Sequence, residues 1–166
     1  PHARTAGYMM WAQAQTLGKI SRSGMAATHD CGELACIHPS DKKTVGSRLA
    51  YMALSNDYGY DLIDANPPIY ESFTVVEGKA LVKFKVGPMG LSPVNTELEG
   101  FELAGEDGIF YPALGRVYND GKYLLVGCPE VPVPVAVRYG MRNWSKATVF
   151  NCNGIPVSPF RSDDWE

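Results

Sequence analysis

The stretch EGKALVKFKV, residues 77–86, decides how the larger part of this chain folds. Apolar side chains at every second position from Ala80 to Val86 alternate with Leu81 and two lysines. A period of two is typical of a β-strand with one buried face. The Glu-Gly pair that opens the stretch predicts a turn from a preceding strand over residues 73–76.

Two further strand signals lie downstream of this stretch. The sequence NDGK at residues 119–122 predicts a hairpin, because an Asp-Gly pair tolerates the positive φ angles of a tight turn. It should join strands over residues 116–118 and 123–126. VAVRY at residues 135–139 gives another alternating strand. Strands at this spacing predict an antiparallel β-sandwich over residues 63–166.

Residues 1–62 have a different character. Strong helix formers without an internal Gly or Pro predict a helix over residues 8–17, and an apolar run at residues 25–28 fits a short buried strand. A second helix should follow Ser40, its expected N-cap, with Asp41 in its positive first turn. One strand and two helices cannot enclose an α/β core, so we expect an incomplete piece of a larger α/β sheet.

Composition excludes several functional classes. The chain has 166 residues, 45% hydrophobic and 20% charged, with a formal net charge of −3, which fits a globular protein without a basic surface for nucleic acid. No apolar run approaches the roughly 20 residues of a membrane-spanning helix. The four cysteines permit the disulfides Cys31–Cys36 and Cys128–Cys152 without establishing them. Their spacing fits zinc poorly, so no metal and no cofactor are expected.

The pair His38-Pro39 carries the sharpest chemical signal of the chain. It lies between the expected strand and the expected second helix, and loops at strand ends commonly hold catalytic groups. A histidine there can act as the general base that takes a proton from a serine hydroxyl. On these residues alone, a plain structural role for His38 at the helix start is favoured, since a lone histidine is a weak marker of a catalytic site.

Several motifs together resemble the sialate O-acetylesterase family of the SGNH hydrolases. Three lie in the first part of the chain: GMAATHD at residues 24–30, IHPSDK at 37–42 and VGSRLA at 45–50. Three more follow in the same order, ELEGFELAGED at residues 97–107, PVPVAVRY at 132–139 and PFRSDDW at 159–165. The resemblance implies that residues 1–62 are the C-terminal part of a flavodoxin-like α/β domain.

The same resemblance implies a serine hydrolase that removes O-acetyl groups from sialic acid or a related glycan. His38 matches the catalytic histidine of the family. The family's nucleophile lies in a Gly-Gln-Ser-Asn-like block, and neither that block nor a Gly-x-Ser-x-Gly motif is present here. We therefore expect an upstream part of the same protein, or another chain, to supply the serine, and this chain to be inactive alone. The family's substrates imply a secreted or periplasmic protein.

The sequence does not identify the group that orients His38. Many SGNH hydrolases place an aspartate three residues before the histidine, and that position here is Ala35. Asp30, Glu33 or a backbone carbonyl near Ala35 could take its place, and a carbonyl would stabilise an imidazolium less than a carboxylate does. For His29 a structural role is favoured.

Six other charged or aromatic residues fit structural roles better than site roles. Arg48 is expected to be a core-rim or salt-bridging residue rather than an oxyanion clamp, and Arg138 and Arg161 could pair across the seam between the two parts. Trp144, Phe150 and Trp165 could stack on sugar rings, although such residues more often fill a core. The main rival function is therefore a non-catalytic carbohydrate-binding β-sandwich module, and a third is a structural domain that mediates oligomer contacts.

Overall fold

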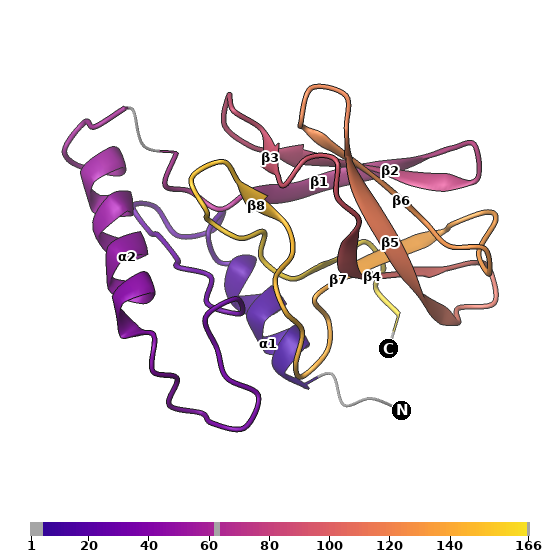
Figure 1. Ribbon diagram of the computed structural model, residues 1–166, viewed down its shortest axis with the longest axis horizontal. Coiled ribbons are helices and arrows are strands. Elements are labelled where there is room, and N and C mark those ends of the chain that lie inside the picture. Colours follow the sequence, from indigo (N-terminus) through magenta and orange to yellow (C-terminus); the bar gives the residue numbers. More distant parts are fainter. Residues whose placement is uncertain (1–4, 62–63, 166) are drawn as a thin grey trace.

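The computed structural model describes residues 5–61 and 64–165. Within these ranges two helices come first and nine strands follow (Figure 1). No helix in this part of the chain is long and apolar enough to cross a membrane. The elements are α1 (Thr5–Ala14), α2 (Lys42–Asn56), β1 (Ile69–Val76), β2 (Lys79–Lys85), β3 (Leu91–Ser92), β4 (Leu98–Ala104), β5 (Phe110–Tyr118), β6 (Tyr123–Gly127), β7 (Ala136–Tyr139), β8 (Phe150–Asn151) and β9 (Phe160–Arg161).

Seven of these strands form one antiparallel sheet in the order β1-β2-β6-β5-β4-β7-β9, and β3 pairs with β8 beside it. The β1–β2 hairpin turns at Glu77 and Gly78, which both have positive φ angles. The β5–β6 hairpin turns at residues 119–122, where Asn119 and Gly121 also have positive φ angles. Both predicted hairpins are therefore confirmed, and so is the strand predicted over residues 135–139.

The sheet curls until its two edges meet, and this gives it the form of a near-barrel. Phe160 on β9 stacks on Tyr70 of β1, with ring centroids 4.5 Å apart and planes 7° apart. It also meets Phe84 of β2 edge-on at 5.6 Å. The inward side chains of the strands fill the space that this curvature encloses. The largest fully buried ones include Tyr139, Phe84, Phe101, Leu91, Leu98, Leu103 and Leu124.

The expected flavodoxin-like domain is wrong for this chain. Within residues 5–61 the structure has two helices and no strand of either sheet. Residues 25–28 pair with no strand. The carbonyl of Ala27, which a sheet neighbour would bind, accepts a hydrogen bond from the Arg48 guanidinium instead. The predicted domain boundary falls on residues 62 and 63, which lie outside the described residues, so that division stays a prediction.

The helices pack beside the curled sheet rather than on a sheet of their own (Figure 1). Helix α1 comes so close to the segment after β7 that a Cβ atom on Gly7 would lie 2.5 Å from the carbonyl carbon of Met141. The guanidinium of Arg161 on β9 lies over the rings of Tyr8 and Trp11, at 5.1 and 5.6 Å. Close backbone approach and cation–π contact therefore hold α1 against β9 and the segment after β7.

A buried carboxylate organises the same region. Asp163 accepts hydrogen bonds from Arg138, at 2.8 Å from its Nε, and from Arg161 at 2.6 Å. The two arginines thus pair through one shared aspartate instead of pairing separately across a seam. Burial opposes the charge of Asp163, but the bonds from both guanidinium groups outweigh it and lower its pKa.

Helix α2 begins one residue later than the expected cap implies. Asp41 is its N-cap, and its carboxylate accepts a hydrogen bond from the backbone N–H of Thr44 at 3.0 Å. Ser40, the predicted cap, donates to the Glu33 side chain instead. Both residues are good caps, and the carboxylate is the one that reaches the free N–H groups. Arg48 and Met52 are the buried residues of the helix.

Two valines on paired strands provide a matched test of this core. Val82 on β2 is completely buried, whereas Val75 on β1 is 46% exposed. We expect Val82→Ala to lower the free energy of unfolding by about 2 kcal/mol, because two buried methyl groups and their contacts are lost. Val75→Ala should lower it by less than about 1 kcal/mol. Urea denaturation measures both, and equal losses would contradict the curled sheet.

Candidate functional site

The structure places His38 on a solvent-exposed loop between the turn at residues 33–36 and helix α2. The backbone of His38 is fixed by Cys36, whose sulfur lies 3.4 Å from both the amide nitrogen and the carbonyl oxygen of His38. The neighbouring Ile37 is 91% exposed. No residue of the two described ranges makes a hydrogen bond to the His38 ring. His38 as a whole is exposed, so its side chain is accessible.

The two acids considered as partners for His38 are engaged elsewhere. Oε1 of Glu33 accepts hydrogen bonds from the backbone N–H of Ser40 at 2.7 Å and from its hydroxyl at 2.8 Å. These bonds lower the pKa of Glu33. Asp30 binds Arg48. The structure therefore brings neither carboxylate to the imidazole, and it shows Glu33 closing the loop onto the start of α2.

Arg48 ties the loop to two distant parts of the chain. Its buried guanidinium donates to the Ala27 carbonyl at 2.6 Å, to Asp30 at 2.7 Å and to the Gly154 carbonyl at 3.1 Å. The guanidinium makes four such bonds, two of them to the two oxygens of Asp30, whereas an ammonium group has only three N–H donors. The predicted salt bridge of Arg48 is confirmed, and its effect is to hold the segment before the His38 loop between α2 and the turn after β8.

His29 lies on the inner side of the same segment. It is buried, its ring meets Tyr139 edge-on at 6.3 Å, and neither ring nitrogen has a hydrogen-bond partner in the structure. Burial lowers its pKa to about 4, and the nearby carboxylate of Asp30 offsets this only in part. A neutral, enclosed imidazole has a packing role, which agrees with the structural role that the sequence favours for His29.

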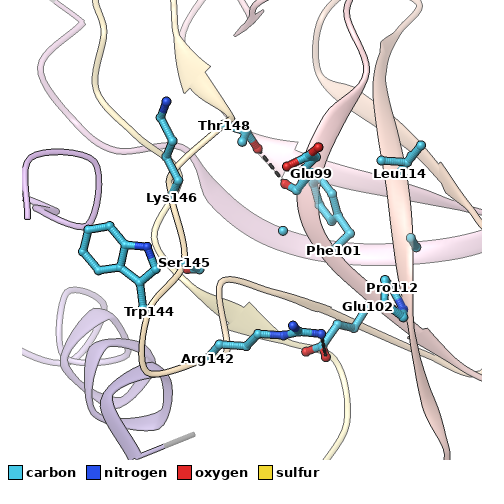
Figure 2. A pocket seen from close by; sticks show the side chains of 12 residues that line it. Glu99, Phe101, Glu102, Pro112, Leu114, Arg142, Trp144, Ser145, Lys146 and Thr148 are labelled. Carbon is cyan, nitrogen blue, oxygen red and sulfur yellow. Dashed lines mark hydrogen bonds and ion pairs between the residues drawn. The ribbon is translucent and has the colours of Figure 1, made fainter. Parts of the chain in front are cut away.

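A pocket of about 450 Å³ opens beside this loop (Figure 2). We call it the Trp144 pocket. One wall comes from β4 and β5 and the other from the segment that follows β7; the lining residues are Glu99, Gly100, Phe101, Glu102, Pro112, Ala113, Leu114, Arg142, Trp144, Ser145, Lys146 and Thr148. A Cβ atom on Gly32 would lie 3.6 Å from the Trp144 ring, so this wall touches the loop that carries His38.

Sequence reasoning considered Trp144 without assigning it to a site. The ring is 42% exposed. Its neighbours Asn143, Ser145 and Lys146 are all polar, and a large aromatic residue within such a run is a signal of surface exposure. Phe150 and Trp165, the other aromatic candidates, are half-buried, and Trp165 packs against Phe110 at 5.8 Å.

No metal centre or disulfide is found in residues 5–61 and 64–165. No cluster of three or more His, Cys, Asp or Glu side chains there is placed to hold a metal ion. All four cysteines have free thiols. Three of these thiols lie within hydrogen-bond distance of backbone carbonyls, as in the 3.1 Å contact between Cys152 and the Met89 oxygen.

Comparison with known proteins gives a likeness to a solved structure. No protein-family model matches the chain, and no curated protein matches it. A crystal structure described as a novel carbohydrate acetylesterase from Xanthomonas citri matches with a TM-score of 0.82 and 36% sequence identity. The match covers 93% of this chain and 35% of that one, so the chain spans about a third of its length. The likeness supports a relationship to carbohydrate esterases.

The burial of His29 predicts a pH dependence of stability. Its pKa is about 4 in the folded chain against 6.5 for an ordinary histidine. The neutral His29 ring therefore contributes fully to the free energy of unfolding above pH 6.5, and this contribution is lost as the pH falls towards 4. The full loss is about 3 kcal/mol. We expect His29→Gln to flatten this dependence in urea denaturation at about pH 7 and about pH 4.5.

His38→Gln is the matched control for this measurement, because His38 is exposed. It should leave the pH dependence as it is in the unmodified chain. The same slope in His29→Gln as in the unmodified chain would show that His29 is not buried as described.

Proposed function

We propose that this chain contributes to a carbohydrate O-acetylesterase. The observation that carries the proposal is the likeness to the Xanthomonas citri carbohydrate acetylesterase over 93% of the chain. Identity of 36% together with a TM-score of 0.82 extends the likeness beyond the backbone fold to the sequence itself. Because the chain spans only about a third of that protein, it would form one part of the catalytic unit.

His38 is the general base of this proposal. Its ring is exposed, it has no hydrogen-bond partner in the part of the chain that the structure describes, and Arg48 and Glu33 fix the loop on either side of it. An accessible imidazole on a held loop can approach a nucleophile and take its proton. No serine hydroxyl of these residues is bonded to a histidine, so the nucleophile would come from an upstream part of the protein or from another chain.

The surface around His38 supports such a partner. Leu34 and Ile37, on either side of the bridge residue Cys36, are 73% and 91% exposed. Large apolar side chains grouped on one part of a protein are typical of surfaces that another protein segment covers. We place the serine-bearing segment against this surface.

The reaction then runs in two steps. The serine oxygen attacks the acetyl carbonyl while His38 takes the serine proton, and the imidazolium passes that proton to the sugar oxygen as the C–O bond to the acetyl group breaks. Water next attacks the acetyl-serine, again giving a proton to His38, and acetate leaves as the proton returns to the serine. Hydrogen-bond donors from the serine-bearing segment would hold the oxyanion in both steps.

Substrate and location form the finer part of the proposal. The motifs at residues 24–50 and 97–107 resemble sialate O-acetylesterases, which favours sialic acid or a related acetylated glycan as the substrate. Such sugars lie outside the cytoplasm in the family, so we propose a secreted or periplasmic protein.

A second candidate is a non-catalytic carbohydrate-binding module. It is favoured by two observations: no carboxylate reaches the His38 ring from the described residues, and the half-exposed Trp144 ring lines a pocket on the β-rich part. A module of this kind would bind sugar without any dependence on His38. Activity measurements therefore separate the two candidates.

The decisive substitution is His38→Ala, in the chain combined with its serine-bearing segment. We expect kcat for acetate release from an acetylated glycan to fall by about a thousandfold or more, with little change in KM, because the proton transfer is lost after the substrate has bound. The chain without that segment should not hydrolyse p-nitrophenyl acetate.

Lys43→Ala is the control, because Lys43 is exposed on the first turn of α2, next to the same loop, and the imidazole stays in place. It should retain most of the kcat. Full activity of His38→Ala would remove His38 from the mechanism. Absence of acetate release in the unmodified combination, together with retained sugar binding, would favour the module.

A further inference from the structure

The Trp144 pocket has an aromatic face that is free to receive a ligand. Trp11 lies under the Arg161 guanidinium and Trp165 packs on Phe110, whereas no ring or cation of the described residues covers Trp144. Trp144 is 42% exposed and is one of the residues that line the pocket (Figure 2). A flat, partly desolvated aromatic surface suits the apolar C–H face of a sugar ring.

Polar groups of both kinds line the same pocket. The Glu99 carboxylate and the Lys146 ammonium have no hydrogen-bond or ion-pair partner within residues 5–61 and 64–165, and both are exposed on the rim (Figure 2). Arg142 is held by the buried Glu102 at 3.0 Å. Sugar hydroxyls both donate and accept hydrogen bonds, so a rim with one free acceptor and free donors matches them. The volume of about 450 Å³ is that of a small-molecule site.

Hydrogen bonds of Tyr139 and Thr148 hold in place the segment that carries Trp144. The Tyr139 hydroxyl accepts hydrogen bonds from the backbone N–H groups of Thr148 at 2.9 Å and Val149 at 3.2 Å. The Thr148 hydroxyl in turn donates to the Glu99 carbonyl at 2.7 Å, which joins the two walls (Figure 2). A site that is formed before the ligand arrives loses less entropy on binding.

The pocket is also next to the proposed catalytic loop. Gly32 lies against the Trp144 ring, six positions before His38 in the sequence. On the other side of the pocket floor, Tyr139 packs against Phe101 at 4.7 Å and meets His29 at 6.3 Å. The segment that leads to His38 therefore forms part of the support of the pocket.

We propose that the Trp144 pocket is a carbohydrate subsite, in which a pyranose ring stacks on Trp144 and its hydroxyls bind Glu99, Lys146 and Arg142. The subsite would hold one ring of the glycan while an acetylated ring of the same glycan lies near His38. This inference rests on the proposed function for the nature of the ligand, and its geometry rests on the pocket itself.

Calorimetric titration of the chain with xylotetraose and with N-acetylneuraminic acid tests the subsite. We expect at least one of these sugars to bind saturably, and Trp144→Ala to weaken that binding by about tenfold or more. Trp144→Phe, which keeps an aromatic face, should restore most of the affinity. The sugar that binds identifies whether a neutral or an acidic ring is preferred.

Tyr118→Ala is the matched control, because Tyr118 is an aromatic residue 50% exposed at the far end of β5 and does not line the pocket. It should bind sugar as the unmodified chain does. Near-ultraviolet circular dichroism verifies that each variant is folded. The subsite is refuted if neither sugar binds, or if Trp144→Ala and Tyr118→Ala weaken binding equally.

The two proposals fail in different ways. Acetate release that depends on His38, with no sugar binding that depends on Trp144, would overturn the subsite and leave the esterase in place. Sugar binding that depends on Trp144, without any acetate release, would support the subsite and remove the esterase.

Discussion

The buried guanidinium of Arg48 is the interaction on which the arrangement of this protein depends. It binds the Asp30 carboxylate and the carbonyls of Ala27 and Gly154, which come from the segment before the His38 loop and from the turn after β8. A buried charge is costly unless all its hydrogen-bonding groups find partners, and here a carboxylate and two carbonyls provide them. One side chain of α2 thereby joins the loop, the helix and the β-rich part of the molecule.

The strands could be predicted because their signals are local. Alternating side chains and turn residues, such as Glu77 with Gly78 and the Asp-Gly pair at residues 120–121, specify each hairpin within about ten residues. The sheet order β1-β2-β6-β5-β4-β7-β9 is set by contacts between distant segments, and no local pattern reports it. The same limit explains the error over residues 25–28: the run has the composition of a buried strand, but Arg48 binds its backbone in place of a neighbouring strand.

The candidate site was predictable only in part. The loop position of His38 follows from the turn residues before it and the helix cap after it. The partners of the nearby acids do not, because Asp30 binds a residue 18 positions away and the Ser40 bonds to Glu33 depend on how the loop closes. The Trp144 pocket combines residues 99–102, 112–114 and 142–148, which meet only in the folded sheet. Its one sequence signal is an aromatic residue in a polar run.

These features give one physical account, in which the loop that presents His38 is held against the wall of the Trp144 pocket. The most direct test is a nuclear Overhauser measurement between the Gly32 α-protons and the Trp144 ring, in the unmodified chain and in Arg48→Met. The account predicts a cross-peak that is present in the first and lost in the second, while the amide protons of β2 and β6 stay protected from exchange in both. A cross-peak that is absent from the unmodified chain, or that persists unchanged in Arg48→Met, would contradict it.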